Sequence, residues 1–408
     1  MIRESILALA LLSAPPGYAQ TPPETIDLET ILSLAQDDTP RLAIEEQDVA
    51  IARADRMIAG ARPNPTVSFT GSHQAAELTN YEGRRAYEGT IEIPLEIGGK
   101  RSSRIRAADQ GIVAARSRLA ASGNELAAEA GVSFVALLVA QEKLDLQTRN
   151  MRDLDRLREV VAGRRAAGMA SEYDLLRIDV ALETWRTELA ETQSDVVAAQ
   201  TELASQLGYV GWKPRAVGML DPAMVGPATK SENLAIVAAR DEQRAVVAGV
   251  EVARRERFPA VSLNTGRFWT TNPYGATYGA GLTVEIPLFD GRKGAVRRAE
   301  AEAQAAALRR QLVEAQVQAD IDRLSAQVDN RTAALARFQA QIEPQLPTLK
   351  QMAEDSYRLS GGSIVELLDS TRTLFETQAT RLELIGKLIE AKIRLQAARG
   401  VISPVARR

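Results

Sequence analysis

A short phrase that occurs twice limits the fold of this chain more than any other sequence feature. Residues 90–101 read TIEIPLEIGGKR and residues 283–294 read TVEIPLFDGRKG, a constant offset of 193 positions in a chain of 408 residues. Similar helical patterns precede and follow each copy. The sequence therefore predicts an internal duplication, in which one folded unit is built twice.

Each predicted unit holds a helix, a β-hairpin and a pair of long helices. Proline ends the first helix of each unit, within ARPNP at residues 61–65 and within RFPA at residues 257–260, because proline lacks an amide donor and clashes with the preceding turn. Alternating residues then form a strand, a turn-rich loop follows, and the repeated phrase is the second strand. Each unit thus contains one hairpin with a long loop.

These signals set the predicted boundaries. The first unit covers residues 20–208, with its hairpin at about 65–95 and its helical pair at 102–208. The second unit covers residues 232–400, with its hairpin at about 259–290 and its helical pair at 295–400. A linker rich in Gly and Pro joins the units at residues 209–231, and residues 401–408 form a C-terminal tail.

The helical pairs have the pattern of coiled coils. Residues 102–163 contain no proline, and apolar residues of the second unit recur at spacings of three and four, as at Ile321, Leu324 and Val328. With 25% charged but only 4% aromatic residues, the composition also favours long helices. We predict a mainly α-helical protein with a long coiled-coil part and a small β part.

Alternation in the repeated strand separates an apolar face from a polar one. Tyr87, Ile91 and Ile93 share one side, whereas Glu88 and Glu92 lie on the other. A β-barrel wall between lipid and water needs this arrangement, because a charge on the lipid face costs ~2–4 kcal/mol at mid-bilayer. Nine of the 18 aromatic residues lie in the two hairpin windows, and such rings favour membrane interfaces. The strands are therefore predicted to lie in a membrane.

Four strands cannot close a barrel in lipid. Unpaired backbone groups at an open edge cost several kcal/mol each in a bilayer, so separate chains must pool their strands. Two copies give eight strands and three give twelve, both even numbers within the range of known barrels. The wider lumen of twelve strands suits helices that continue as a tube, which favours a homotrimer. A small soluble sheet packed on the helices is the alternative.

The N-terminal segment indicates where the protein is located, and the scarcity of cysteine and histidine excludes several classes of protein. Arg3, an apolar run at residues 6–12 and small residues near residue 19 predict a signal peptide at residues 1–19, cleaved after Ala19. With no cysteine and a single histidine, His73, disulfides and Cys/His metal sites are excluded. The net charge of -3 gives no footprint for nucleic acid. We predict an exported protein that is not an enzyme and has no cofactor.

The chain resembles the TolC-like outer-membrane factor family of efflux proteins over essentially all of its mature length. The strand endings IEIPLEIGGKR and VEIPLFDGRKG and the segment YRLSGGSIVELLDSTRTLFETQATRLELIGKLIEAKIRLQAARG carry the resemblance. RPNP followed by IPLEIGGKR resembles the cobalt-zinc-cadmium (CzcC-like) branch. The resemblance implies a homotrimer with a twelve-stranded barrel in the outer membrane of a Gram-negative bacterium, in contact with outer-membrane lipid, and a helical tunnel across the periplasm.

The resemblance also implies a function and two partners. Such proteins are passive exit ducts of tripartite efflux systems and dock with a periplasmic adaptor (membrane fusion protein) and an inner-membrane pump, which in this branch is of the resistance-nodulation-division (RND) type. Heavy-metal cations are then the expected cargo. A drug-efflux or type I secretion outlet of the same fold is an alternative, because the pump chooses the cargo. A purely structural periplasmic coiled-coil protein is a third interpretation.

Two acids near the turn of the second helical pair are candidate site residues. Glu366 and Asp369 are three positions apart and share a helix face, so three chains would place six carboxylates around a narrow end and attract cations. A solvated helix start, where acids favour the N-terminal dipole, is the alternative. The resemblance assigns both acids to the periplasmic aperture and adds Asp174 and Tyr357.

Glycines mark the predicted tips of the helical pairs. The turns lie at Gly168 and at Gly361 and Gly362, where we expect contact with the adaptor. The family pattern has a latching arginine where this chain has Gly362, which puts such a latch in doubt and leaves Arg358 as a substitute.

Basic residues follow each repeated strand, at the point where the predicted barrel becomes helix. They are expected to contact lipid headgroups or to form a solvated face. These residues are Lys100, Arg101, Arg104, Arg106, Arg292, Lys293, Arg297 and Arg298.

Overall fold

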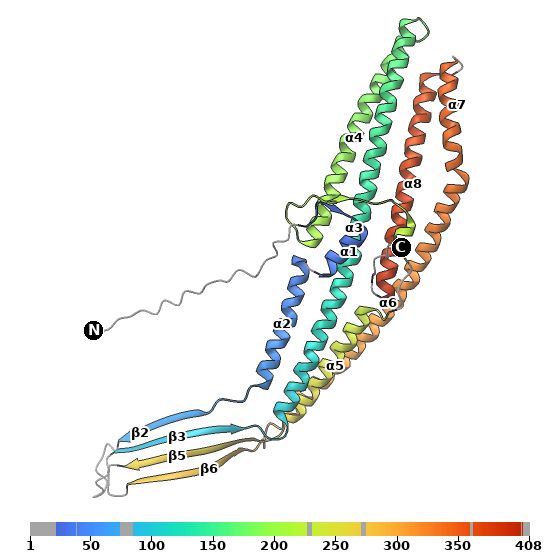
Figure 1. Ribbon diagram of the computed structural model, residues 1–408. Helices are drawn as coiled ribbons and strands as arrows, with labels where there is room; N and C mark the ends of the chain where they lie inside the picture. Colours follow the sequence, from blue (N-terminus) through green and yellow to red (C-terminus); the bar gives the residue numbers. More distant parts are fainter. Residues whose placement is uncertain are drawn as a thin grey trace, which may run out of the picture.

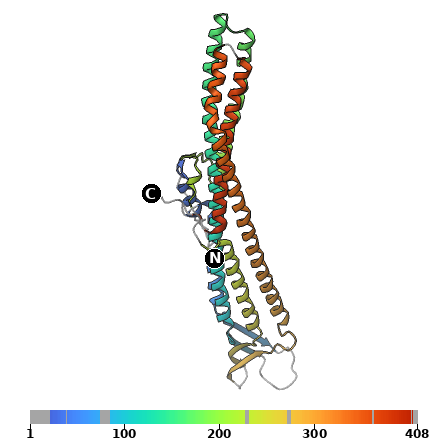
Figure 2. The ribbon, with the colours of Figure 1, turned by 90° about the vertical axis from the view of Figure 1, so that its right-hand side faces the viewer.

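The computed structural model describes residues 22–37, 39–73, 85–226, 231–270, 275–359, 362–400 and 402. The predicted signal peptide at residues 1–19, Gly361 and the predicted tail apart from Ile402 lie outside these residues. A β-sheet stands at one end of the molecule, and long helices run from it to two helical tips at the other end (Figure 1). Turned by 90°, the helices form a narrow column above the sheet (Figure 2).

The order of elements repeats along the chain. The first half contains β1 (Thr25–Ile26), α1 (Leu28–Asp37), α2 (Pro40–Gly60), β2 (Thr66–His73), β3 (Arg85–Leu95), α3 (Lys100–Ala166) and α4 (Glu172–Leu207). Between the halves lie β4 (Arg215–Ala216) and the 3-10 helix η1 (Pro222–Met224). The second half contains α5 (Leu234–Arg255), β5 (Ala260–Thr270), β6 (Ala276–Glu285), α6 (Lys293–Gln341), the 3-10 helix η2 (Glu343–Gln345), α7 (Leu346–Arg358) and α8 (Ile364–Arg399).

Local sequence sets where the helices begin and end. Thr39 caps α2, because its hydroxyl accepts a hydrogen bond from the amide of Leu42 (3.2 Å). α4 ends at Gly208, whose φ of 83° is a left-handed conformation that glycine adopts readily. α3 runs unbroken for 67 residues, about 100 Å, whereas Pro344 and Pro347 coincide with the break between α6 and α7.

The hairpins of the two halves join into one antiparallel sheet. The strand order is β2-β3-β5-β6, and the joint between β3 and β5 places Tyr87 opposite Trp269 and Ile93 opposite Leu263. Among the described strands, β2 and β6 have no partner on their outer sides. The sheet of one chain is therefore open at two edges.

The helices next to the sheet follow the order of the strands. α2 packs on α3, α3 on α5 and α5 on α6, so that four helices stand side by side (Figure 1). Within the α3–α5 joint, the hydroxyl of Ser117 donates to the buried carboxylate of Asp241 (2.6 Å). α2 and α6 are thus the edges of the helical layer, on the same sides as β2 and β6.

The largest core lies midway along the molecule. Here α1, α3, α4 and α8 pack against the segment between the halves, and Phe134 and Ile389 are fully buried. β1 pairs in parallel with β4, and the Nε1 of Trp212 donates to the carbonyl of Pro23 (3.0 Å). An 18-residue window of α3 is apolar enough to cross a membrane, but 61% of it is buried inside the protein. The segment predicted only as a linker therefore also contributes to the core.

Candidate channel wall and aperture

One face of the four-stranded sheet is apolar. The register extends the predicted alternation over all four strands, and the rings of Phe69, Tyr87 and Trp269 lie with their centroids 5.7, 5.8 and 6.1 Å apart. This face can contact lipid tails. Its larger apolar members are Val67, Phe69, Tyr87, Ile91, Ile93, Val261, Leu263, Trp269, Tyr278, Leu282 and Val284.

The other face of the sheet is polar. The hydroxyls of Ser68 and Thr90 lie 2.5 Å apart, and the Nδ2 of Asn264 donates to the Thr283 hydroxyl (2.5 Å). These contacts link neighbouring strands on one surface, as a wall facing water allows. Its acids are Glu88, Glu92 and Glu285, and no Lys or Arg lies on this face among the described strand residues.

The basic residues that follow the strands form ion pairs within the chain. Lys100 and Arg104 fit neither predicted alternative, lipid headgroup contact or a solvated face, since their side chains are only 12% and 28% exposed. Arg104 pairs with Glu96, and both cations reach Glu256 of the other half, at 3.7 Å from Lys100 and 3.9 Å from Arg104. Arg292 also pairs with Glu256 (3.3 Å). The charges stabilise the joint between the halves at the base of the sheet.

Two of the predicted aperture acids belong to capping boxes. Ser171 caps α4 and Ser363 caps α8, and each accepts from the amide three residues on, at Asp174 (3.1 Å) and Glu366 (3.2 Å). The carboxylates of these two acids accept in return from the serine amides, at 2.8 and 3.3 Å. The motifs SEYD and SIVE signalled this arrangement in the sequence. Asp174 and Glu366 therefore both stabilise the N-terminus of a helix.

Glu366 and Asp369 remain exposed at the second tip. Glu366 shares its carboxylate with the cap, whereas Asp369 is one turn further along α8. Among the described residues, no group of three or more His, Cys, Asp or Glu side chains could hold a metal ion. Exposed carboxylates of this kind can attract cations.

The structure brings Tyr357 and Asp174 together across the two halves. Tyr357 is 7% exposed and packs with Val161 and Ile364, and its pKa is raised by burial and further by the carboxylate of Asp174, while Arg164 opposes that rise. Its hydroxyl has no hydrogen-bond partner among the described residues. The phenol is therefore neutral at any physiological pH.

Arg164 crosses between the helical tips and was not predicted. Its Nη1 donates to the carbonyl of Arg358 (2.8 Å), and its guanidinium carbon lies 5.1 Å from the centre of the Tyr357 ring. The side chain of Arg358 instead pairs with Asp355 in its own helix (3.1 Å). Arg358 therefore contacts the other tip through its backbone carbonyl, and the cation in this contact is Arg164 of α3.

Gly362 occupies a position with little room for a side chain. A Cβ there would lie 2.6 Å from the hydroxyl oxygen of Ser356 and 3.1 Å from a carboxylate oxygen of Glu366. A long basic side chain at this position would require the tip to shift. Gly168, at the first tip, has a φ of 75° and open space around it.

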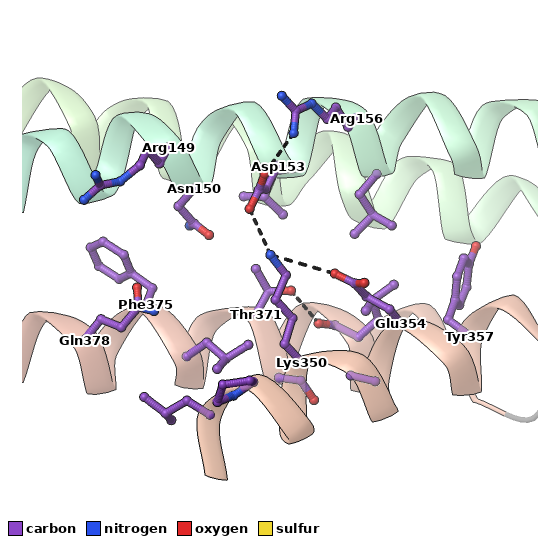
Figure 3. A pocket seen from close by; sticks show the side chains of 18 of the residues that line it. Arg149, Asn150, Asp153, Arg156, Lys350, Glu354, Tyr357, Thr371, Phe375 and Gln378 are labelled. Atoms are coloured by element: carbon purple, nitrogen blue, oxygen red, sulfur yellow. Dashed lines mark hydrogen bonds and ion pairs between the residues drawn. The ribbon is translucent and has the colours of Figure 1, made fainter. Parts of the chain in front are cut away.

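A groove of about 880 Å³ runs between α3 on one side and α7 and α8 on the other (Figure 3). Leu154 and Phe375 contribute to its apolar lining. Lys350 projects across the groove, with its Nζ 3.2 Å from Asp153 of α3 and 4.0 Å from Glu354 of its own helix (Figure 3). The two helical pairs are thus joined by a solvated ion pair above an apolar lining.

An open sheet with one lipid-type face, continuous with helices about 100 Å long, defines a membrane channel subunit rather than a globular domain. The family model for outer membrane efflux proteins matches residues 31–209 and 227–401, one match in each half. The chain belongs to the outer membrane efflux protein family. It is thus an outer-membrane protein with a helical extension into the periplasm.

Individual relatives agree with this family. The chain is 28% identical over 384 residues to the cobalt-zinc-cadmium resistance protein CzcC of Cupriavidus metallidurans, covering 90% of this chain and 88% of that protein. It is 27% identical to the nickel-cobalt-cadmium resistance protein NccC of Alcaligenes xylosoxydans xylosoxydans, over 77% of this chain and 70% of that protein.

Solved structures share the fold. A crystal structure of CusC matches with a TM-score of 0.77 at 20% identity, over 93% of both chains. The Campylobacter jejuni CmeC outer membrane channel matches with a TM-score of 0.76 at 13% identity, over 93% of this chain and 87% of that one. The predicted TolC-like architecture, a helical barrel joined to a β-barrel, is confirmed.

Proposed function

We propose that this protein is the passive exit duct of a tripartite efflux system that exports heavy-metal cations. The observation that carries the proposal is the sheet: it has one apolar face, one acidic face and two open edges, and it continues into long helices. Membership of the efflux family and the metal-resistance relatives support the cargo. No catalysis is needed of such a duct, because the pump supplies the energy.

The open edges support assembly as a ring of identical chains. β6 and α6 lie at one side of the protomer and β2 and α2 at the other, so a second copy can add to both layers at once. Such a head-to-tail contact closes into a ring if the rotation allows. Three copies give twelve strands, the number proposed from the sequence.

The internal α3–α5 joint identifies the residues that would meet between copies. The repeat makes Gln47 of α2 the counterpart of Asp241 and Arg310 of α6 the counterpart of Ser117, since Pro65 matches Pro259 and Lys100 matches Lys293. Large apolar side chains flank both counterparts and are 57–69% exposed in one chain. These are Ile44 and Ile51 in α2 and Leu308 and Leu312 in α6.

Glu366 and Asp369 are proposed to give the aperture its preference for cations. In a trimer, six carboxylates would surround the narrow end, and the acids Glu88, Glu92 and Glu285 would continue the negative lining in the barrel. Asp174 and Tyr357, which influence each other across the two tips, are proposed to belong to the same aperture. Metal ions would then be conducted without a tight site.

The tips are the proposed contact for the periplasmic adaptor. Gly168 and Gly362 lie at the turns, and Gly361, the third predicted contact residue, lies outside the described residues. The groove along α3, α7 and α8 offers an apolar lining with charged sides to an amphipathic helix of that partner. The inner-membrane RND-type pump would complete the system.

The cargo is tested with a deletion strain. We expect loss of the gene to raise sensitivity to cobalt, zinc, cadmium, nickel or copper salts at least severalfold and to leave a panel of drugs unaffected. Drug sensitivity without metal sensitivity would favour the drug-efflux outlet. Protein that is washed from membranes by carbonate would contradict the duct and favour a periplasmic coiled-coil protein.

A further inference from the structure

Arg267 is a charged residue on the apolar face of the sheet. The register places it beside Gly89 of β3 and Tyr278 of β6, on the same side as Leu263 and Trp269. A charged side chain on a lipid face is costly at mid-bilayer and much less so near the headgroups. A favourable interaction is therefore needed to offset the cost of Arg267 on this face.

The guanidinium of Arg267 lies between two aromatic rings. Its central carbon is 5.5 Å from the ring centre of Trp269 and 5.5 Å from that of Tyr278. These contacts hold the side chain in place but leave its N–H donors without acceptors. In the part of the chain that the structure describes, the Arg267 side chain makes no hydrogen bond or ion pair.

Among the described strand residues, no carboxylate lies on this face to pair with Arg267. The described residues of all four strands place Glu88, Glu92 and Glu285 on the opposite face. A neighbouring copy would add another β2 beside Tyr278, and the apolar face of β2 carries no acid either. Arg85, at the start of β3, adds a second positive charge to the same face. The described strand residues thus supply no anion for Arg267, and a ligand from outside the protein can supply one.

The position along the strand matches the outer headgroup layer. Arg267 is three residues before Thr270, the end of β5 that points away from the helices (Figure 1). At about 3.3 Å per residue and a barrel tilt of about 40°, the strand end is less than about 10 Å higher. A long arginine side chain spans much of that distance.

We propose that Arg267, held between Trp269 and Tyr278, binds a phosphate group of an outer-leaflet lipid. Arginine matches phosphate geometry with paired N–H donors, and aromatic rings belong at the same depth of the bilayer. The site anchors the barrel to phosphorylated lipid and is independent of the cargo. It rests on the outer-membrane location and not on the proposed metal transport.

The test uses the purified full-length protein in detergent and two probes, lipid A with its phosphates and the same lipid dephosphorylated. Native mass spectrometry counts bound lipid, and the melting temperature reports stabilisation. We expect phosphorylated lipid A to bind about tenfold more tightly than the dephosphorylated form, and Arg267→Gln to abolish that difference. Arg267→Lys should retain part of it, since the charge stays but the planar fork is lost.

Arg323→Gln is the matched control, because it removes the same charge from α6, far from the sheet. It should keep the full preference for phosphorylated lipid. Equal binding of both lipids to the unaltered protein would overturn the proposal, even if Arg267→Gln failed to fold. The proposal would also be overturned if Arg267→Gln kept the full preference for phosphorylated lipid A. The same holds if inorganic phosphate alone raised the melting temperature as much as phosphorylated lipid A does.

Discussion

α3 and α6 are counterparts in the two halves, yet they have different surroundings. α3 stands in the middle of the protomer and buries 20 of its residues, whereas α6 stands at an edge and buries five. α3 is also continuous for 67 residues, while α6 ends after 49 at a proline-containing turn. The duplicated sequence has thus diverged according to position: the central copy builds a core, and the edge copy keeps apolar side chains for a neighbour.

The largest expected effect comes from the centre of α3. Phe134→Ala should destabilise the protein by about 3–5 kcal/mol, because the ring is fully buried in the mid-molecule core and a cavity would remain. The control is Gln327→Ala, the counterpart in α6, which should change stability by less than about 0.5 kcal/mol. Denaturant titration compares the two, and equal losses would contradict the difference between the helices.

The next effect concerns the edge. Ile44→Asp places a charge in the proposed contact between α2 of one chain and α6 of the next and removes an apolar side chain worth about 1.5–3 kcal/mol on burial. We expect light scattering in detergent to show mostly monomer. Met219→Asp, also at an exposed apolar residue but away from both edges, should leave the trimer intact. If Ile44→Asp still formed a trimer, the proposed contact between α2 and α6 of neighbouring chains would be contradicted.

A third prediction compares the two tips. The double variant Glu366→Gln, Asp369→Asn removes the exposed charges of the second tip. It keeps at position 366 a side-chain oxygen that can accept the hydrogen bond from the Ser363 amide. We expect single-channel recordings to show at least a twofold loss of cation over anion preference. Asp174→Asn at the first tip should have a smaller effect. In that repeat, the position that corresponds to Asp369 is occupied by a cation, Arg177, instead of a second acid. Unchanged selectivity in the double variant would exclude the acidic aperture.

The smallest effect is expected where α3 meets α8. The Nζ of Lys143 lies 2.6 Å from Glu383, and this hydrogen bond lowers the pKa of the carboxyl group. A lowered pKa stabilises the fold above the ordinary glutamate value of about 4.3, and the gain is lost as the pH falls through the folded value. Since Glu383 is 44% exposed, Glu383→Gln should cost less than about 1 kcal/mol at pH 7 and progressively less as the pH falls. A cost that does not fall with the pH would mean that the shape of the side chain, and not its charge, matters there.

Much of this architecture could be predicted from the sequence. The repeated phrase and the alternation at Ile91 and Glu92 set the strands and their faces, because the period of a strand is strictly two. The pairing of β3 with β5 was not predicted, since contacts between distant strands leave no local pattern. The β1–β4 pair was missed because each strand has only two residues.

The candidate site was predicted only in part. The tip acids were named, but their capping role at Asp174 and Glu366 was overlooked although both motifs are legible. Arg164 could not be found, because its partner Arg358 is 194 residues away and contributes a carbonyl rather than a side chain. For Lys100 and Arg104 only lipid contact and a solvated face were considered, because a run of charges does not show which carboxylates fold against it.

Cross-linking of two introduced cysteines tests the pooled barrel most directly, because the chain has no cysteine of its own. Ile44→Cys and Leu312→Cys would place one thiol on each edge of the protomer. With a short bismaleimide on intact cells, the double variant should give a ladder that ends at three chains, and each single variant only monomer. A double variant that remains monomeric, or a ladder that stops at two or continues past three, would contradict a ring of three identical chains sharing one sheet.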